Sequence, residues 1–236
     1  MRLAIMQPYV FPYLGYFQLI NSVDRFVVYD DVTFIKQGWI NRNNILVNNR
    51  SYLFSVPLER QSSFTKIKDI RISSKHYDRW KDKFYKTVEQ NYKRAPFFED
   101  AFKLLHVVLE GSEHDFLISK LAISSLKSIN KYLDLKVEFV NSSSDYNNSN
   151  LSGQERVMDI CMKEAATQYV NPISGAGLYS KEDFRMKNLD LYFIKPQSIV
   201  YDQMNNEFIP WLSIIDVIMF NSVEQVALLI KKYEIL

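Results

Sequence analysis

The sequence predicts an α/β fold, a Rossmann-like and mostly parallel sheet flanked by helices, with an antiparallel β-hairpin and a helical insertion. Two observations support it. Near both ends of the chain, short β-branched runs alternate with helical patterns, which is the order of a parallel βαβ sheet. Between these parts lie alternating runs followed by three long helical patterns, an arrangement that does not continue the βαβ order.

The chain opens with one predicted βαβ unit. Residues 2–6 form an apolar run typical of a buried parallel strand. Apolar residues recur at helical spacing over 14–23, and 25–29 is a second β-branched run. Both strands are followed by polar residues, Gln7 after the first and Asp30-Asp31 after the second. In open α/β sheets the carboxyl ends of strands are where ligands bind, so we expect these residues and Lys36 to meet in one cleft.

The middle of the chain predicts antiparallel structure and then helices. Residues 44–47 and 52–56 alternate around Asn48-Asn49, which indicates a β-hairpin. The run 67–72 (IKDIRI) alternates as well and predicts a third antiparallel strand. The three helices expected next run from Ser73 or Ser74 to about Tyr92, from Pro96 to Leu109 with Gly111 ending it, and over 113–133.

The last hundred residues return to strands and helices. They are predicted to contain a strand at 136–140, a polar loop with little to bury at 141–150, a helix capped by Ser152, a short strand at 169–170, a glycine-containing loop, a strand at 189–194, and helices at 211–220 and 222–233. We therefore expect a single domain over 1–236. Its α/β core comprises 1–35 and 134–236, and the hairpin and helical insertion comprises about 36–133.

Composition narrows the class of protein. The 236 residues are 47% hydrophobic and include 6 Gly and 1 Cys, which excludes disorder, collagen and disulfide frameworks. The net charge of +2 argues against a dedicated nucleic-acid binder. No apolar run reaches the roughly 18 residues that span a membrane, and Pro8 and Pro12 interrupt the N-terminal apolar stretch. We expect a soluble, cytoplasmic protein with no nucleic-acid partner and no membrane span.

The densest cluster of polar and aromatic residues follows the second predicted strand. Two carboxylates there can accept a proton or bind a metal. The basic side chains can hold phosphate, and the indole can stack on a base or a sugar ring. A plain solvated turn is the alternative interpretation. The cluster comprises Asp30, Asp31, Lys36, Trp39, Arg42 and Asn43.

Two further segments are candidates for ligand contact. Tyr13-Leu14-Gly15-Tyr16 lies where nucleotidyltransferases place an HxGH signature, but Tyr supplies no positive charge. That layout is also explained by a loop and a helix packed through Gly15. Ser174 and Gly175, with Tyr179 nearby, can present backbone N–H groups to an anion. No lysine follows as in a P-loop, and a flexible connection is the alternative.

Other reactive residue types favour structural interpretations. Cys161 lies on an apolar helical face and is expected to be a buried, inert thiol. His76, His106 and His114 lack the spacing of a zinc site, so we expect no metal. Asp216 lies in an otherwise apolar helix and must find partners or stay protonated.

Taken together, three segments resemble the WbqC-like protein family. They are AIMQPYVFPYLGYFQLINSVDRFVVYDDVTFIKQGWINRN at 4–43, GQERVMDICMKEAATQYVNP at 153–172 and FIPWLSIIDVIMFN at 208–221. The resemblance extends over essentially the whole chain. It implies a bacterial protein of O-antigen, lipopolysaccharide or other surface polysaccharide biosynthesis, with a nucleotide-linked sugar, often an amino sugar, as its substrate.

The function that follows is a transferase that forms an amide on a nucleotide-linked amino sugar by N-acyl or aminoacyl transfer. The expected catalytic residues are Asp30, Asp31 and Lys36. Asp30 or Asp31 would accept the amine proton, and Lys36 together with Arg42 would hold the diphosphate. The remaining expected substrate contacts are Gln7, Tyr13, Tyr16, Trp39, Arg42, Asn43, Ser174, Gly175 and Tyr179. No cofactor is implied beyond an acyl donor such as a CoA thioester, and the sequence does not indicate the oligomeric state. The alternatives are a divergent nucleotidyltransferase-like enzyme without the HxGH histidines and a non-catalytic binding or scaffold protein.

Overall fold

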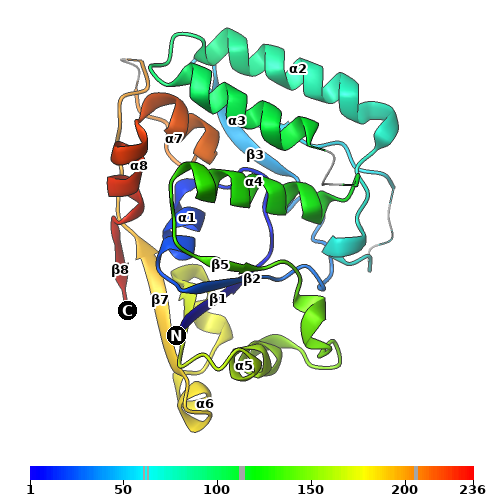
Figure 1. Cartoon of the computed structure of the whole chain (residues 1–236), viewed down its shortest axis with the longest axis vertical. Coiled ribbons are helices and arrows are strands. Elements are labelled where there is room, and N and C mark those ends of the chain that lie inside the picture. The colour runs from blue at the N-terminus through cyan, green and yellow to red at the C-terminus, as the bar shows by residue number, and fades with distance from the viewer. Residues whose placement is uncertain (61, 63, 112–114, 205–206) are drawn as a thin grey trace.

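Six strands form one sheet in the order β5-β2-β1-β6-β7-β8 (Figure 1). The structure, a computed structural model, describes residues 1–236 apart from 61, 63, 112–114 and 205–206. The first five strands in this order are parallel to their neighbours, and β8 runs antiparallel to β7. The predicted α/β class is therefore confirmed. The strands are β1 (Arg2–Met6), β2 (Arg25–Val28), β5 (Glu138–Val140), β6 (Gln168–Pro172), β7 (Asp190–Pro196) and β8 (Tyr233–Ile235).

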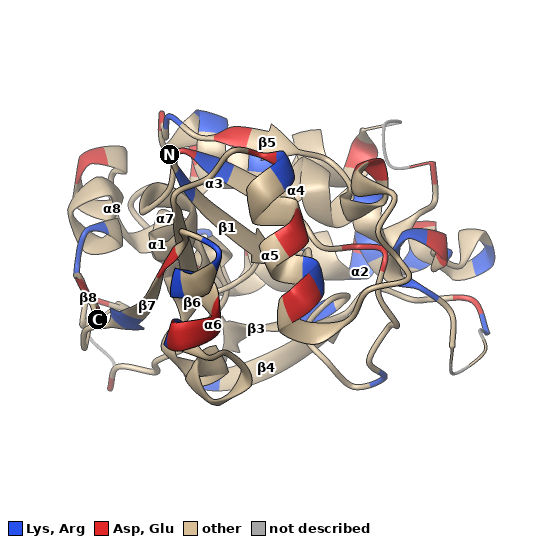
Figure 2. Ribbon diagram, turned by 90° about the horizontal axis from the view of Figure 1, so that it is seen from below, with Lys and Arg blue, Asp and Glu red and all other residues tan. Residues whose placement is uncertain are grey.

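Helices cover both faces of this sheet. The α-helices are α1 (Leu14–Asn21), α2 (Ser74–Tyr92), α3 (Phe98–Glu110), α4 (Ile118–Tyr132), α5 (Gly153–Lys163), α6 (Lys181–Met186), α7 (Ile214–Phe220) and α8 (Val223–Ile230). Helices α5 and α6 lie on one face, which is turned toward the viewer in Figure 2, and the others lie on the opposite side (Figures 1 and 2). Within β1, Leu3 and Ile5 pack toward α5, and Ala4 packs into the larger cluster on the other face. Because both faces are covered, the strand is apolar at successive positions.

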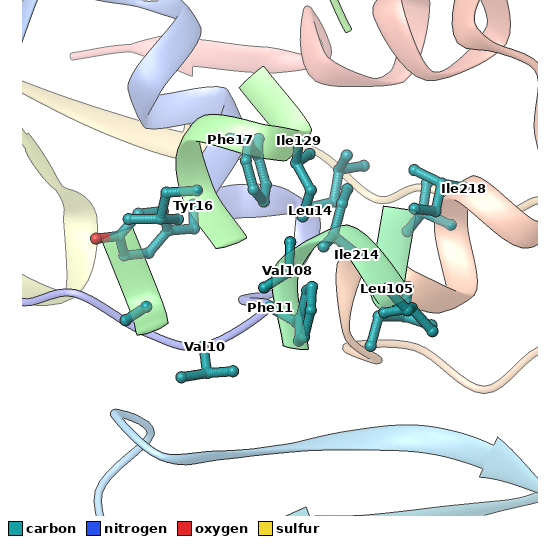
Figure 3. Close-up of a cluster of buried hydrophobic side chains, with 14 of the residues drawn as sticks. Val10, Phe11, Leu14, Tyr16, Phe17, Leu105, Val108, Ile129, Ile214 and Ile218 are labelled. Carbon is teal, nitrogen blue, oxygen red and sulfur yellow. The ribbon is translucent and has the colours of Figure 1, made fainter. Parts of the chain in front are cut away.

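The insertion shares its core with the rest of the chain. Figure 3 shows side chains of the loop after β1, of α1, of α3 and α4, and of α7 packed in one cluster, among them Phe11, Phe17, Leu105, Ile129 and Ile214. All five are buried. The inserted helices therefore bury apolar surface against both ends of the sequence, which is the main stabilising contribution in such a core.

The hairpin forms as predicted, but the described residues add no third strand to it. Strands β3 (Arg42–Val47) and β4 (Arg50–Ser55) pair antiparallel. Both turn residues, Asn48 and Asn49, have positive φ angles of 49° and 58°, the requirement of a type I′ turn. The predicted strand at 67–72 is wrong: residues Ile67–Asp69 form the 3₁₀ helix η1. Ile67 and Ile70 are both buried, and their i,i+3 spacing fits one turn of 3₁₀ helix.

Two other predictions in the last third of the chain are corrected. The expected helix over 222–233 ends at Ile230, and the chain then adds β8 beside β7. Residues 141–150, expected to bury little, contain the 3₁₀ helix η3 (Ser143–Tyr146), and Ser143 and Asn148 are almost fully buried. These polar side chains can be buried because they are hydrogen-bonded: the Ser143 hydroxyl accepts from the Asp31 backbone N–H after β2, and Asn148 bonds to Arg156 and Asp159 of α5.

Asp216 lies on α7 at the centre of a buried hydrogen-bond network. The Tyr92 hydroxyl donates to its Oδ1 at 2.8 Å, and Tyr201 and Gln203 donate to its Oδ2 at 2.6 and 2.8 Å. Tyr92 in turn accepts from the Leu46 backbone N–H. Burial raises the pKa of Asp216, although these three donors oppose the rise. The network gives this carboxyl group a structural role that joins the hairpin, α2 and α7.

Candidate functional site

The switch in strand order lies between β1 and β6. From β1 the chain crosses through α1 to β2 on one side, whereas α5 leads to β6 on the other side. The carboxyl ends of β1 and β6 are therefore the place where open α/β sheets bind ligands. Gln7 follows β1, and β2 pairs with β1 in the register Met6↔Val28, so Asp30 and Asp31 follow at the same edge. The 3₁₀ helix η4 (Ile173–Leu178) follows β6.

Asp31 is held by three basic side chains. Its Oδ1 lies 2.6 Å from the Lys66 Nζ and 3.4 Å from the Lys68 Nζ, and its Oδ2 lies 3.0 Å from an Arg156 Nη. Arg156, on α5, also donates to the Asp31 main-chain carbonyl and to Asn148 Oδ1, each at 3.0 Å. Burial alone would raise the pKa of Asp31, but the hydrogen bonds of Lys66 and Arg156 and the charge of Lys68 lower it overall. This carboxylate is ionised and fully occupied.

Asp30 has neutral partners instead. The Ser142 hydroxyl and the Ser143 backbone N–H donate to its Oδ1 at 2.7 and 3.1 Å. Burial raises the pKa of Asp30, and these two donors and the charge of Lys68 only partly offset the rise. The neighbouring carboxyl groups thus have pKa values shifted in opposite directions. Asp30 is the one suited to take up a proton, because a group with a raised pKa is the stronger base.

An aromatic cavity of about 330 Å³ lies beyond the end of β1. Tyr13 and Trp39, both predicted as ligand contacts, are brought together in it. Trp39 remains 47% exposed and Trp211 69% exposed, so their rings are available to a ligand. The cavity is lined by Tyr9, Tyr13, Trp39, Asn43, Asn44 and Trp211.

A second, larger cavity of about 470 Å³ also has Tyr13 and Trp211 in its lining. These two rings pack edge to face with centroids 6.0 Å apart, and both residues line both cavities. The second cavity is formed by the start of α1, the segment after β7 and residues 208–212. Two adjoining cavities with a shared aromatic wall can accommodate two parts of one ligand or two ligands.

Lys36 and Arg42, the basic residues predicted to hold phosphate, line neither of these cavities nor a third one, which Asp30 lines. Arg42 donates to the carbonyl oxygens of Gly38, at 2.8 Å, and Gln37, and its guanidinium lies 5.7 Å from the Trp39 ring centre. Lys36 is exposed and forms no ion pair with another described residue. The cavity that Asp30 lines is formed with Lys68 and not with Lys36 or Gln7. Through its hydrogen bonds to the carbonyl oxygens of Gly38 and Gln37, Arg42 organises the loop that carries Trp39.

Asn43 and Tyr16 have internal hydrogen bonds. Asn43 Nδ2 donates to the Phe11 carbonyl at 2.8 Å, which fixes the loop after β1 against β3. Tyr16 is 2% exposed, and its hydroxyl donates to the Gln7 carbonyl at 2.7 Å. The structure places Tyr16 in the core beneath the loop, whereas Tyr13 lines the cavities.

The glycine-containing loop is built around Asn171. Gly175 is buried, and a Cβ at this position would lie 2.2 Å from Asn171 Oδ1. Asn171 in turn donates to the Tyr169 hydroxyl at 2.7 Å. Tyr179 packs edge to face on Tyr169. The segment that includes Ser174 is a 3₁₀ helix, not a loose connection.

The remaining reactive residues are placed as structural groups. Cys161 is fully buried and burial raises its pKa to about 12, so its thiol stays protonated. His106 stacks on Tyr85 and pairs with Glu110, and His76 contacts Ser73, whereas His114 lies outside the described residues. Within the described ranges, no three His, Cys, Asp or Glu side chains gather as a metal ion would require. Likewise, no described helix is long and apolar enough to cross a bilayer.

Sequence reasoning missed several residues of this region. Lys68 lies in the run 67–72 that predicts a strand, Lys66 lies directly before it, and Arg156 and Trp211 lie in segments that predict helices. A basic residue beside the apolar Val157 and Met158 on α5 was the available signal for Arg156, because a charge on a buried helix face must be paired.

Comparison with known proteins agrees with the resemblance noted from the sequence. The family model described as "WbqC-like protein family" matches residues 7–228. An uncharacterized protein of Mycobacterium tuberculosis, Rv1507c, is 30% identical over 222 residues, which cover 93% of each chain. No solved structure matches this chain.

Proposed function

Because the chain belongs to the WbqC-like protein family, we propose that it is a cytoplasmic bacterial transferase acting on a nucleotide-linked amino sugar in surface polysaccharide biosynthesis. The observation that supports this most directly is the pair of cavities divided by Tyr13 and Trp211. Flat aromatic walls with carboxamide groups at the edge suit a nucleobase or a sugar ring. The polysaccharide context comes from the resemblance of the sequence to the family.

The two cavities suggest how substrate and donor would be divided. The smaller cavity, with Trp39, Asn43 and Asn44, suits a ring with hydrogen-bonding edges. The larger cavity, with Leu14, Ile199 and other apolar side chains, suits the less polar acyl portion of a donor such as a CoA thioester. A shared wall would hold the two reactants next to each other, and positioning of this kind lowers the barrier to a bimolecular reaction.

The proposed reaction forms an amide. The sugar amine attacks the thioester carbonyl and a C–N bond forms. The C–S bond then breaks, so that the acyl group stays on nitrogen and the thiolate departs. The proton lost by the amine passes to a carboxylate and then to the thiolate. Of the two aspartates, Asp30 fits this role better than Asp31, because its pKa is raised and both of its donors contact Oδ1 alone, whereas three cations contact Asp31. Asp30 lines a separate cavity and neither of the two that would hold the reactants, so the amine would have to extend toward the end of β2 to reach it.

A binding screen on the intact chain tests this proposal. Nucleotide-linked amino sugars, CoA thioesters and nucleoside triphosphates are compared by thermal shift, because a ligand of the folded state raises the unfolding midpoint. We expect nucleotide-linked sugars to raise it for the wild type, to do so less for Trp39→Ala and Trp211→Ala, and to do so fully for Tyr52→Ala. Tyr52 is a partly exposed aromatic residue of β4 and lines neither cavity.

Other outcomes have distinct meanings. Binding of triphosphates with magnesium, and not of nucleotide-linked sugars, would overturn the proposal in favour of a nucleotidyltransferase-like enzyme. Binding of the sugar without amide formation in the presence of each acyl thioester would leave a binding protein of the same pathway. Mass spectrometry of the sugar shows whether an acyl group has been added, and so distinguishes a transferase from a protein that only binds the sugar.

A further inference from the structure

A third cavity, at the end of β2, has several lysine and serine side chains in its lining. It has a volume of about 460 Å³ and lies between η1, the outer side of α4 and the loop after β5. Its lining surface is largely apolar and includes Leu117 and Ile123. Its polar lining consists of Asp30, Lys68, Ser119, Lys120, Ser124, Lys127, Ser128, Asn141 and Ser142.

The basic residues around Asp31 are not balanced by acidic ones. Lys66, Lys68 and Arg156 all contact this one carboxylate, which can neutralise a single positive charge. Lys66 and Lys68 compete for the same oxygen, and Lys68 has the longer contact, 3.4 Å against 2.6 Å. Lys68 is also the member of this group that lines the cavity. Its ammonium therefore has positive charge to offer to an anion there.

Helix α4 adds a polar stripe on the same cavity. Lys120, Ser124, Lys127 and Ser128 are spaced i, i+4, i+7 and i+8, so they share one side of the helix. Lys120 contacts Asp115, whereas Lys127 forms no ion pair with any described residue. Lysine and serine on one helix face, turned into a cavity, supply both charge and hydrogen-bond donors.

Asp30 is the acidic group inside this cavity. Its Oδ1 is already hydrogen-bonded by Ser142 and Ser143, and burial shifts it toward the protonated form. The other acidic groups nearby, Asp31 and Asp115, are each in contact with lysine. Even when Asp30 and Asp31 are both ionised, the basic side chains named here outnumber the acidic ones. The basic set is Lys66, Lys68, Lys120, Lys127 and Arg156, and the acidic set is Asp30, Asp31 and Asp115.

We propose that this cavity is a phosphoryl-binding site that takes a mono- or diphosphate group, with Lys68 and Lys127 as its principal cationic contacts. Lys120 and the serine hydroxyls complete the set of donors, because phosphate oxygens accept several charge-assisted hydrogen bonds at once. The same group can come from free phosphate or pyrophosphate or from the diphosphate of a nucleotide-linked compound. The inference depends on the cavity alone and holds whether or not the chain transfers an acyl group.

Calorimetric titration of the full chain with inorganic pyrophosphate tests the site without any nucleotide or sugar. We expect the wild type to bind, and Lys68→Ala and Lys127→Ala each to weaken binding about tenfold or more, the effect of losing a hydrogen bond between charged groups. Lys131→Ala is the matched control, since Lys131 is an exposed lysine of α4 outside the cavity. It should change the affinity less than twofold.

A second titration series, with phosphate, a nucleoside diphosphate and a nucleotide-linked sugar, identifies the source of the group. Tighter binding of the nucleotide compounds than of pyrophosphate, with the same sensitivity to Lys127→Ala, assigns the site to a diphosphate-linked ligand. Equal affinity assigns it to the free anion. The proposal is overturned if the folded wild type binds none of these anions at low salt, or if the two cavity variants bind them as the wild type and Lys131→Ala do. Neither result bears on acyl transfer.

Discussion

The Arg156 guanidinium reaches Asp31 at two points, the carboxylate Oδ2 and the main-chain carbonyl oxygen, each at 3.0 Å, and both residues are at least 95% buried. The contact joins the end of β2 to the first turns of α5, which are 125 residues apart in the sequence. It fixes the end of β2, where the two aspartates and the cavity lined by Asp30 and Lys68 lie. Energetically it is an ion pair that is costly to break from one side.

Replacing Asp31 by Asn should destabilise the fold. The change leaves Arg156 buried without its countercharge, and Lys66 and Lys68 also lose their partner. We expect the free energy of unfolding to fall by about 3 kcal/mol, measured by urea denaturation at neutral pH. A loss below about 1 kcal/mol would show that water or another anion compensates the three cations.

Replacing Asp30 by Asn should not lower the free energy of unfolding at neutral pH, unlike the Asp31→Asn change. Burial raises the pKa of Asp30, so the fold disfavours the ionised form. The stability that the protonated group contributes is therefore lost as pH rises through its folded-state pKa. We therefore expect Asp30→Asn to be as stable as the wild type or more stable at pH 7. The difference should vanish below the ordinary carboxyl pKa of about 4.

The pH profile separates the two aspartates further. Because the pKa of Asp31 is lowered, its contribution is fully present above the unfolded-state pKa and is lost as pH falls through the lower folded-state value. Unfolding curves of both Asn variants and the wild type across acid and neutral pH check both signs. A stability loss for Asp30→Asn at pH 7 comparable to that of Asp31→Asn would contradict the assignment.

Arg42→Ala should weaken ligand binding indirectly. Arg42 holds the carbonyl oxygens of Gln37 and Gly38 and stacks near Trp39, so its loss frees the loop that presents the indole. For the nucleotide-linked sugar we expect an affinity loss on the order of 1 kcal/mol. The salt dependence of binding should stay equal to that of the wild type, because no phosphate contact is removed. A weaker salt dependence in the variant would instead indicate a direct phosphate contact.

Gly175→Ala and Gly177→Ala form a matched pair. A Cβ at Gly175 would clash with Asn171 Oδ1, and Asn171 cannot easily move because it donates to buried Tyr169. A Cβ at Gly177 would meet no atom within 4 Å. We expect a loss of about 1–3 kcal/mol for the first variant and a change within about 0.5 kcal/mol for the second, measured by thermal and urea unfolding. Equal stability of the two variants would mean that the loop after β6 adapts.

Local patterns predicted much of the fold, and long-range contacts account for what they missed. The β1–α1–β2 unit and the Asn48-Asn49 hairpin follow from hydrophobic period and turn chemistry, which are properties of adjacent residues. Lys66 and Lys68 could not be assigned to Asp31, because a 35-residue separation hides the contact and the IKDIRI run has both strand-like and 3₁₀-like spacing. Similarly, Trp39 was identified by residue type, but its partner Trp211 comes from the far end of the chain.

The Asp216 network has a consequence for the order of folding. The hairpin contributes the Leu46 N–H, α2 contributes Tyr92, and the acceptor on which Tyr92 depends lies 124 residues further on. The Tyr92 hydroxyl therefore gains this acceptor only after α7 has been synthesised. Contacts of such large sequence separation slow folding, since the entropy of closing the loop is lost before the contact forms. We therefore expect the packing of α7 against the hairpin and α2 to form late in folding.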